Sequence, residues 1–171
     1  MIIARPEHRR IFERRLKERG IDTQGAIARE QLRFYDAEET LGKFMQNGQP
    51  DWTAFHTLIG GVIAEMRLHY SAVRAYGEMV DILWQKGERD AAIHLEEFWN
   101  ELGRLQTFAL FCAYHLDHLD AKAYDGALER ICHVHTHLIP VRDYARFDEA
   151  VQRVSERVLE QPVLAEVRAH S

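Results

Sequence analysis

The 171-residue chain has few cysteines, no excess of positive charge and no long apolar run, and each shortage excludes a class of protein. Its two cysteines, Cys112 and Cys132, lie far apart in apolar runs, which is typical of reduced core thiols in a cytosolic protein. A net charge of −5 and a pI near 6.1 argue against direct nucleic-acid binding. With no run near the ~18 residues that span a bilayer and no signal peptide in MIIARPEHRR, we predict a cytoplasmic location without membrane association.

Two groups of catalytic and nucleotide-binding motifs are also missing. No GxxxxGK[ST] loop occurs, and no GxGxxG motif follows a predicted strand, so a standard phosphate loop is excluded. Ser71 and Ser155 lack the GxSxG turn that exposes a hydrolase nucleophile. The pair Gly60-Gly61 sits in a helical pattern, where close helix packing is its expected role. We therefore predict no cofactor and favour a non-enzymatic protein.

What the sequence does contain is an alternation of strand-like and helix-like segments. Four apolar runs rich in β-forming residues cover 1–4, 31–36, 71–77 and 107–114. Helical spacing covers 6–19, a segment from 51 to 66 that Asp51 would cap, 79–86 and 88–102. Alternating strands and helices predict βαβ units and a mainly parallel sheet. The near-continuous apolarity of 107–114 fits a strand buried on both faces.

The length fits one compact domain. After residue 120 the pattern is helical, with breaks at Pro140 and Pro162. We predict a three-layer α/β fold with about four or five strands over residues 1–140. Residues 141–171 are predicted to form a helical extension of the same domain. The basic run over 7–20 is mixed with glutamates and is interpreted as a solvated helix face rather than a phosphate-binding arm.

The junction at Gly77-Glu78 raises the question of a ligand site, because a strand ends there and a helix follows directly. Gly77 would allow the turn, and the dipole of the following helix would favour the carboxylate of Glu78. Ligands of open α/β sheets bind at the carboxyl ends of the strands. The residues at such predicted strand ends are Asp36, Gly77, Glu78, Tyr114 and His115. Tyr35, Tyr76 and Trp84 could form an apolar wall beside them.

Glu96 and Asn100 lie one turn apart on the predicted helix over 88–102. The plain interpretation is a solvated helix edge. The alternative is that these polar groups face the sheet, where they would require partners that a pocket could supply. Together with the strand ends, the candidate ligand-binding residues are Asp36, Tyr76, Gly77, Glu78, Glu96, Asn100, Tyr114 and His115.

The segment CHVHTHLIP, residues 132–140, is rich in histidine. On a helix, Glu129, His133 and His137 would form a stripe able to hold Zn²⁺ with one open position. Such stripes also occur as ordinary surface, and histidine-rich stretches without further ligands are weak signals. We predict no metal site and keep this stripe as the alternative.

Several longer segments resemble one known family. VRAYGEMVDILWQKG, AAIHLEEFWNEL and FALFCAYHL are similar to the central block of the MEDS domain, a sensory domain of methanogens, methylotrophs and the dichloromethane-responsive regulator. FYDAEETLGKFMQNGQPDWTAF and ICHVHTHLIP resemble further parts of that family, so that the match covers residues 1 to about 140. The motif positions are Glu78, Glu96, Asn100, Cys112 and Tyr114, with His135 or His137 in the last element.

This resemblance implies a fold related to RecA/KaiC-like ATPases without a working phosphate loop. It also implies a small-molecule sensor that acts through a transcription regulator or a histidine kinase, with a ligand that is a hydrocarbon derivative. Family members usually begin with an additional strand and helix that contain an "H…FY" motif. This chain lacks that unit, so we expect an N-terminally shortened MEDS domain with an open sheet edge that favours a homodimer or a partner strand.

Three functions follow from these observations. The first is a non-catalytic sensory module that binds a small molecule at the carboxyl edge of the sheet and signals through a partner. The second is a protein-interaction or oligomerisation module that uses the open edge and the amphipathic segment FDEAVQRVSERVLEQ. The third is a metal-dependent enzyme built on the histidines of 129–137. We favour the first.

Overall fold

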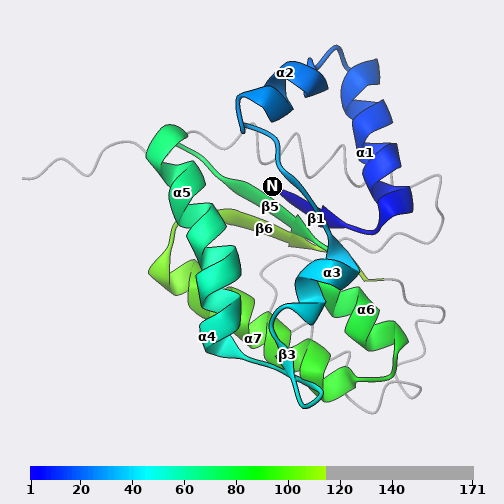
Figure 1. Cartoon of the computed structure of the whole chain (residues 1–171), viewed down its shortest axis with the longest axis vertical. Coiled ribbons are helices and arrows are strands. Elements are labelled where there is room, and N and C mark those ends of the chain that lie inside the picture. The colour runs from blue at the N-terminus through cyan, green and yellow to red at the C-terminus, as the bar shows by residue number, and fades with distance from the viewer. Residues whose placement is uncertain (115–171) are drawn as a thin grey trace, which may run out of the picture. The chain divides into compact units, whose positions relative to one another are not determined.

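The computed structural model describes residues 1–114, and these form a parallel sheet flanked by helices (Figure 1). The strands of the sheet stand in the order β2-β1-β5-β6, and each adjacent pair is parallel. Their bounds are β1 (Ile2–Ala4), β2 (Phe34–Asp36), β5 (Arg74–Gly77) and β6 (Ala109–Cys112). The four predicted strands and their parallel arrangement are confirmed. β1 lies inside the sheet, and the edge strands of the described part are β2 and β6.

The helices cover the two faces of the sheet according to which strands they connect. The connection from β1 to β2 holds α1 (Pro6–Glu18) and α2 (Thr23–Ala28). The connection from β2 to β5 holds α3 (Ala37–Gly42), α4 (Trp52–Phe55), the π-helix η1 (His56–Gly60) and α5 (Gly61–His69). α6 (Met79–Gln85) and α7 (Arg89–Leu105) connect β5 to β6. In Figure 1, α1 and α2 lie on one side of the sheet and the other helices lie opposite, which gives three layers.

Local sequence signals explain where these elements begin and end. Pro6 starts α1, where its missing N–H costs nothing, and Gly20 follows the helix at a φ of +75°. The predicted cap is confirmed, because the side chain of Asp51 accepts a hydrogen bond from the backbone N–H of Ala54 at 2.8 Å. Gly87, at a φ of +78°, separates α6 from α7.

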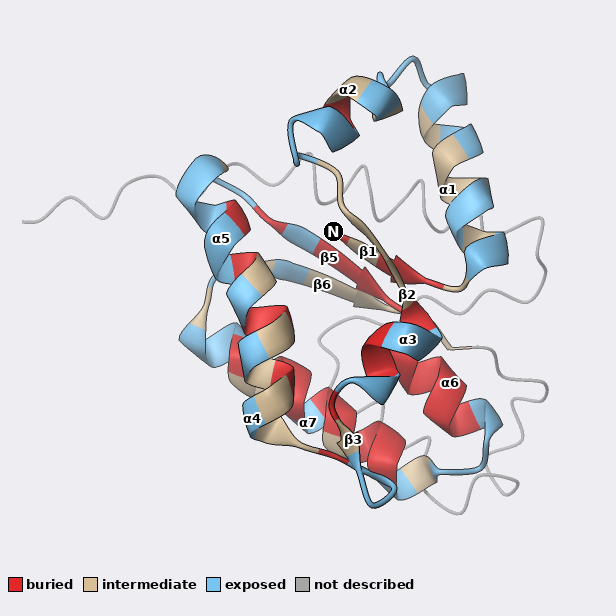
Figure 2. Cartoon of the chain, in the orientation of Figure 1, coloured by how far each residue is buried: buried red, intermediate tan, exposed pale blue. Residues whose placement is uncertain are grey.

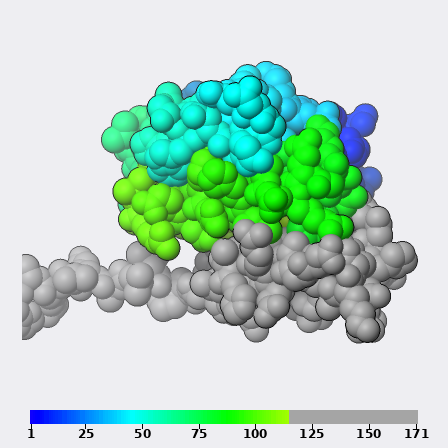
Figure 3. Space-filling model, turned by 90° about the horizontal axis from the view of Figure 1, so that it is seen from below, coloured from blue at the N-terminus to red at the C-terminus, as the bar shows by residue number. Residues whose placement is uncertain are grey.

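A two-stranded hairpin, β3 (Met45–Gln46) and β4 (Gln49–Pro50), was not among the predicted elements. Its turn is the dipeptide Asn47-Gly48, with φ values of +52° and +79°. Asn-Gly with two positive φ angles is the strongest short hairpin signal, although strands of two residues give no alternation to support it. Seen from below in Figure 3, the segment with α3 and this hairpin packs directly on α6 and α7.

The core lies between the sheet and the lower helices, where Figure 2 shows the buried residues concentrated. Phe55, Trp99 and Leu102 are among its fully buried side chains. α6 buries six consecutive residues from Met79 to Trp84, and α7 buries eight of its seventeen. By contrast, α1 buries none of its thirteen residues completely. The helices α6 and α7 on one face of the sheet are therefore much more buried than α1 on the other face.

The glycine pair marks the π-helix. A Cβ atom on Gly60 would lie 3.2 Å from Cδ1 of Leu102 and 3.3 Å from Nε2 of Gln106, whereas one on Gly61 would meet open space. The side chain of Gln106 donates to the carbonyl of Gly60 at 3.2 Å. Close helix packing is therefore confirmed for Gly60, while Gly61 is exposed.

Candidate functional site

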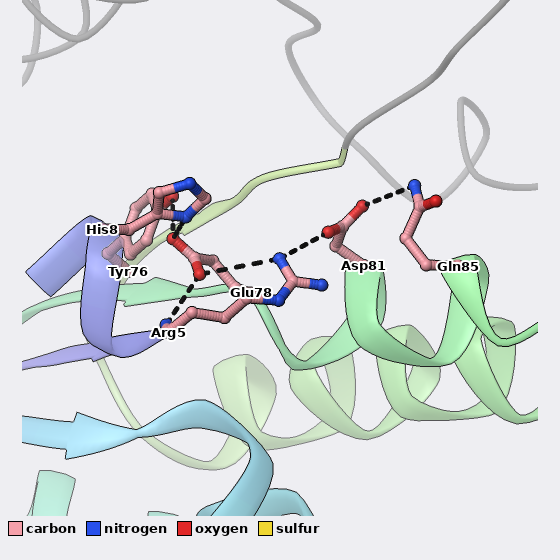
Figure 4. Close-up of polar contacts among 6 residues, drawn as sticks. All are labelled: Arg5, His8, Tyr76, Glu78, Asp81 and Gln85. Carbon is pink, nitrogen blue, oxygen red and sulfur yellow. Dashed lines mark hydrogen bonds and ion pairs between the residues drawn. The ribbon is translucent and has the colours of Figure 1, made fainter.

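The strand order places a switch point between the carboxyl ends of β1 and β5, which is called the crevice below and which side chains fill. The chain leaves β1 toward α1 on one face of the sheet and leaves β5 toward α6 on the other. At such a switch point the two connections diverge, and open α/β proteins bind their ligands there. The residues that occupy this crevice are Arg5 and His8 after β1, and Glu78 and Asp81 after β5 (Figure 4).

Glu78 is the centre of this group and is only 1% exposed. Its Oε2 accepts a hydrogen bond from the backbone N–H of Arg5 at 2.9 Å. Its Oε1 lies 2.8 Å from Nδ1 of His8 and accepts a hydrogen bond of 2.8 Å from the phenol of Tyr76. A buried carboxylate is stable only when such donors compensate its lost hydration. Glu78 therefore joins α1 to the central strand β5.

Glu78 stands at the start of α6, as the sequence predicts, but its carboxylate binds at the start of another helix. Glu78 is the N-cap residue of α6, yet its side chain caps no N–H group of that helix. The carboxylate instead binds the N–H of Arg5, which is the N-cap residue of α1 and offers no side-chain cap of its own. The favourable dipole that the carboxylate meets is that of α1. Helix N-termini are favourable places for anions, and at the start of α1 the anion is the carboxylate of Glu78.

Arg5 carries the positive charge of the crevice. Its Nη1 lies 2.8 Å from Oδ2 of Asp81 and 3.9 Å from Oε2 of Glu78. Desolvation lowers the pKa of the Arg5 guanidinium, but the hydrogen bond and charge of Asp81, with the charges of Glu78 and Glu7, raise the pKa overall. Asp81 is 4% exposed and also accepts a hydrogen bond of 3.4 Å from Gln85. One guanidinium thus links two buried carboxylates at the start of α6.

Aromatic rings surround the polar group. The ring of Tyr76 meets Phe12 edge-on at 4.7 Å and stacks on Phe111 at 5.7 Å. Burial, with the charge and hydrogen bond of Glu78, raises the pKa of the Tyr76 phenol. The phenol is therefore neutral and acts as a donor. Tyr76 and Glu78 were expected to share a face only if the strand continued through 78; the strand ends at Gly77, and the two side chains still converge.

A second polar cluster joins β6 to α7. The phenol of Tyr114 donates to Oε1 of Glu96 at 2.5 Å, and Sγ of Cys112 lies 3.6 Å from Oε2 of the same carboxylate. Burial, followed by the charge of Glu96, raises the pKa of Tyr114 and that of Cys112. Cys112 is a free thiol, and the ring of Trp84 meets Tyr114 edge-on at 6.1 Å. A raised pKa keeps the thiol protonated, so this cysteine is no thiolate nucleophile.

The solvated-edge interpretation of Glu96 is wrong, because Glu96 is 2% exposed and faces the sheet. Asn100, one turn further along α7, is half-buried. The other predicted positions have local roles. Asp36 ends β2 and caps α3 through the N–H of Glu39 at 2.9 Å. Gly77 does not have a positive φ, and a Cβ there would meet only Trp99 at an ordinary 3.8 Å, so the turn does not require glycine.

The sequence interpretation missed Arg5, His8 and Asp81. Arg5 directly follows a predicted strand, so the rule that selected the ends of the other three strands would have found it. His8 and Asp81 lie within the first turn of a helix, where only the switch point brings them together. His115, Glu129, His133, His137, Cys132 and the predicted helical extension lie outside the described residues.

A shallow groove lies elsewhere, between the hairpin and the helices α4 to α5. Its lining includes Lys43, Thr57 and Glu65, and none of the eight predicted ligand residues belongs to it. Its charged groups Lys43 and Glu65 are paired with Glu39 at 2.7 Å and with Arg33 at 2.8 Å. Because Glu78 lies at the switch point between β1 and β5 and no predicted ligand residue lines the groove, we take the crevice as the candidate site.

Comparison with known proteins connects this geometry to a family. The family model of MEDS, described as the methanogen/methylotroph, DcmR sensory domain, matches residues 1–136. The chain belongs to the MEDS family. No curated protein and no solved structure shows a significant match to it. Among the motif positions of the MEDS resemblance, Cys112 and Tyr114 both contact Glu96, and Glu78 binds the backbone N–H of Arg5 in the crevice.

Two properties of this MEDS domain follow from its described residues. No helix within residues 1–114 is long and apolar enough to cross a membrane. Within the same range, no three His, Cys, Asp or Glu side chains are grouped so that they could hold a metal ion.

Proposed function

We propose that this MEDS domain senses a small molecule at the carboxyl edge of its sheet and passes the signal to a partner protein. The observation that supports the proposal best is the buried polar group around Glu78, located at the switch point between β1 and β5. Burying the carboxylates of Glu78, Asp81 and Glu96 near the carboxyl edge of a small sheet costs folding free energy, compared with apolar residues of similar size. Such costly groups are typical of functional sites rather than of plain cores.

The surroundings of the crevice support an apolar or partly apolar ligand. Phe12, Tyr76 and Phe111 contribute aromatic rings beside a few fixed polar groups, and Trp84 packs on Tyr114 in the second cluster. Small-molecule sites usually have this composition, with apolar walls for affinity and few polar groups for orientation. We propose a hydrocarbon derivative as the ligand class, in agreement with the family resemblance.

In this proposal the main role of Glu78 is to hold neighbouring protein groups in place, and direct contact with the ligand is secondary. Its two oxygens already bind the N–H of Arg5, the imidazole of His8 and the phenol of Tyr76. A ligand that alters any of these contacts changes how α1 is attached to β5. We include no catalytic step, and we propose a cytoplasmic domain whose partner is a histidine kinase or a transcription regulator.

A thermal-shift screen tests the sensing function. The purified chain is heated with a panel of small apolar and halogenated compounds, each over a range of concentrations. A ligand at one hundred times its Kd stabilises the folded chain by about 2.7 kcal/mol, which corresponds to a rise in Tm of roughly 5–11 °C for a domain of this size. We expect at least one compound to raise Tm in proportion to the logarithm of its concentration.

Matched variants locate the site. Tyr76→Phe and Tyr114→Phe remove one hydroxyl each at the carboxyl edge, whereas Tyr70→Phe removes a hydroxyl that donates to the carbonyl of Arg29 away from that edge. The compound should lose affinity with at least one edge variant and keep it with the control. The sensing proposal fails if no compound raises Tm, and the location fails if all three variants respond alike.

A further inference from the structure

α1 and its flanking residues carry a charge opposite to that of the rest of the chain. Residues 5–19 contain seven Arg or Lys and three Glu, which gives +4. Since the whole chain carries −5, the remaining residues carry −9. The segment therefore forms a positive region on a negatively charged protein, and such a region attracts negative partners.

Three cations of α1 share its outer face. Arg10, Arg14 and Lys17 are spaced by four and three residues and are all exposed. Arg10 and Lys17 form no ion pair with any residue of the described range, and Arg14 reaches Glu18 only at 3.8 Å. Like charges four residues apart, as at Arg10 and Arg14, destabilise a helix. The glutamates of the helix pair along its flanks instead, as Glu13 does with Arg9 at 2.9 Å.

The helix is also attached in a way that leaves this face outward. None of its residues is fully buried, and its contacts with the sheet include Phe12 on Tyr76 and His8 on Glu78. In Figure 1, α1 lies on the opposite side of the sheet from α3 to α7 and at the edge of the described residues. The crevice therefore sets the orientation in which α1 presents its three outer cations.

We propose that Arg10, Arg14 and Lys17 form a docking surface for an acidic helix of the signalling partner. The inference rests on the proposed function in so far as that function requires a partner. Three positive charges on one helix face can pair with three carboxylates at the same spacing on a second helix. Coiled coils use interhelical salt bridges of this kind beside their apolar seam. An extended polyanion such as DNA or a lipid surface would meet the −9 of the remaining chain as well, which opposes its approach.

A peptide-binding assay tests the surface. The probe is a fluorescent, helix-forming peptide with glutamates spaced by four and three residues, and its control has glutamines in their place. We expect the full chain to bind the glutamate peptide, more weakly at high salt, and not the glutamine peptide. The triple variant Arg10→Gln, Arg14→Gln, Lys17→Gln should raise Kd about tenfold, as the loss of several exposed charge pairs predicts.

A second triple variant controls for net charge. Lys43→Gln, Lys86→Gln and Arg104→Gln removes the same three charges from exposed positions outside α1. Its Kd should stay within about twofold of the wild-type value. Equal losses in both triples, or equal binding of both peptides, would overturn the proposal.

Two other measurements decide between partner classes. Tighter binding of DNA or of anionic vesicles than of the glutamate peptide, lost in the α1 triple, would replace the acidic helix by a polyanion. Self-association of the wild-type chain that the α1 triple abolishes in sedimentation would identify a second copy as the occupant. No small molecule is used in these assays. A negative result would therefore overturn the docking surface without deciding whether the domain senses a small molecule. The α1 triple should keep any ligand-induced rise in Tm, because its substitutions lie outside the crevice.

Discussion

The backbone N–H of Arg5 donates a hydrogen bond of 2.9 Å to the carboxylate of Glu78, a residue 73 positions further along the chain. This contact bridges the ends of the two central strands, and it fills the start of α1 with an anion that the chain itself supplies. A helix N-terminus favours an anion. At the start of α1 the carboxylate of Glu78 takes that place.

Replacing Glu78 should destabilise the fold strongly. Glu78→Ala leaves the N–H of Arg5 and the phenol of Tyr76 without their acceptor in a buried place, and we expect a loss of about 3 kcal/mol in the free energy of unfolding. Glu78→Gln keeps one acceptor oxygen and should cost less. Urea denaturation measures both values. The exposed Glu97→Ala on α7 is the control and should change stability by no more than about 0.5 kcal/mol.

Alkaline pH should weaken the fold through its buried hydroxyl and thiol groups. The pKa values of Tyr76, Tyr114 and Cys112 are raised in the folded chain. On raising the pH, the unfolded chain loses the thiol proton near pH 8.5 and the phenol protons near pH 10, while the folded chain keeps them. The unfolded state then binds fewer protons, so the free energy of unfolding falls as pH rises.

The size of this effect can be assigned to one residue. A fully ionised tyrosine in the unfolded chain contributes a slope of about 1.4 kcal/mol per pH unit. Tyr76→Phe should therefore lower stability at pH 7 but flatten the decline between about pH 10 and 11.5. Denaturation curves at several pH values measure the slope. An unchanged slope in Tyr76→Phe would contradict a raised pKa at this phenol.

Glu96 and Tyr114 should be energetically coupled. Their contact of 2.5 Å joins β6 to α7 at a carboxylate that is 2% exposed. In a double-mutant cycle with Glu96→Gln and Tyr114→Phe, we expect a coupling energy of about 1–2 kcal/mol. The same cycle with Tyr70→Phe in place of Tyr114→Phe should give a value near zero. Equal coupling in the two cycles would show that the contact contributes nothing specific.

The neighbouring glycines offer a test of packing. Both lie in right-handed helical conformation, so alanine gains helix propensity at either position. Gly61→Ala adds its methyl group in open space and should stabilise the chain by about 0.5–1 kcal/mol. At Gly60 the methyl group would press on Leu102 and Gln106, which offsets the gain. Gly60→Ala should be less stable than Gly61→Ala by about 1 kcal/mol, and equal values would contradict the crowding.

Much of this fold could be predicted from the chain, because its elements have local signals. The four strands appear in the sequence as short apolar runs. Asp51 marks a helix start by capping, and Gly20 and Gly87 mark helix ends by their positive φ. The hairpin at Asn47-Gly48 has a clear turn signal but strands of only two residues, which carry no periodicity. The π-helix has no sequence signal of its own; Gly60 indicates only that packing is close.

The candidate site was predictable in part. The strand-end rule selected Glu78 and Tyr114, which do gather at the carboxyl edge. The rule could not identify their partners. Glu78 meets His8 only because β1 and β5 are neighbours in the sheet, and the sequence does not give the strand order. For a similar reason the sequence left open whether Glu96 faces solvent or the sheet: its partner Tyr114 lies outside α7, and spacing along α7 alone cannot decide.

The crevice has a consequence for the local unfolding of the sheet. Its two sides come from segments far apart in the chain, so neither β1 with α1 nor β5 with α6 contains it as a local unit. Joining them requires the closure of a long loop, whose entropic cost only the assembled sheet compensates. A molecule held there would therefore slow hydrogen exchange in β1 and β5 together, because both strands must separate before either can open.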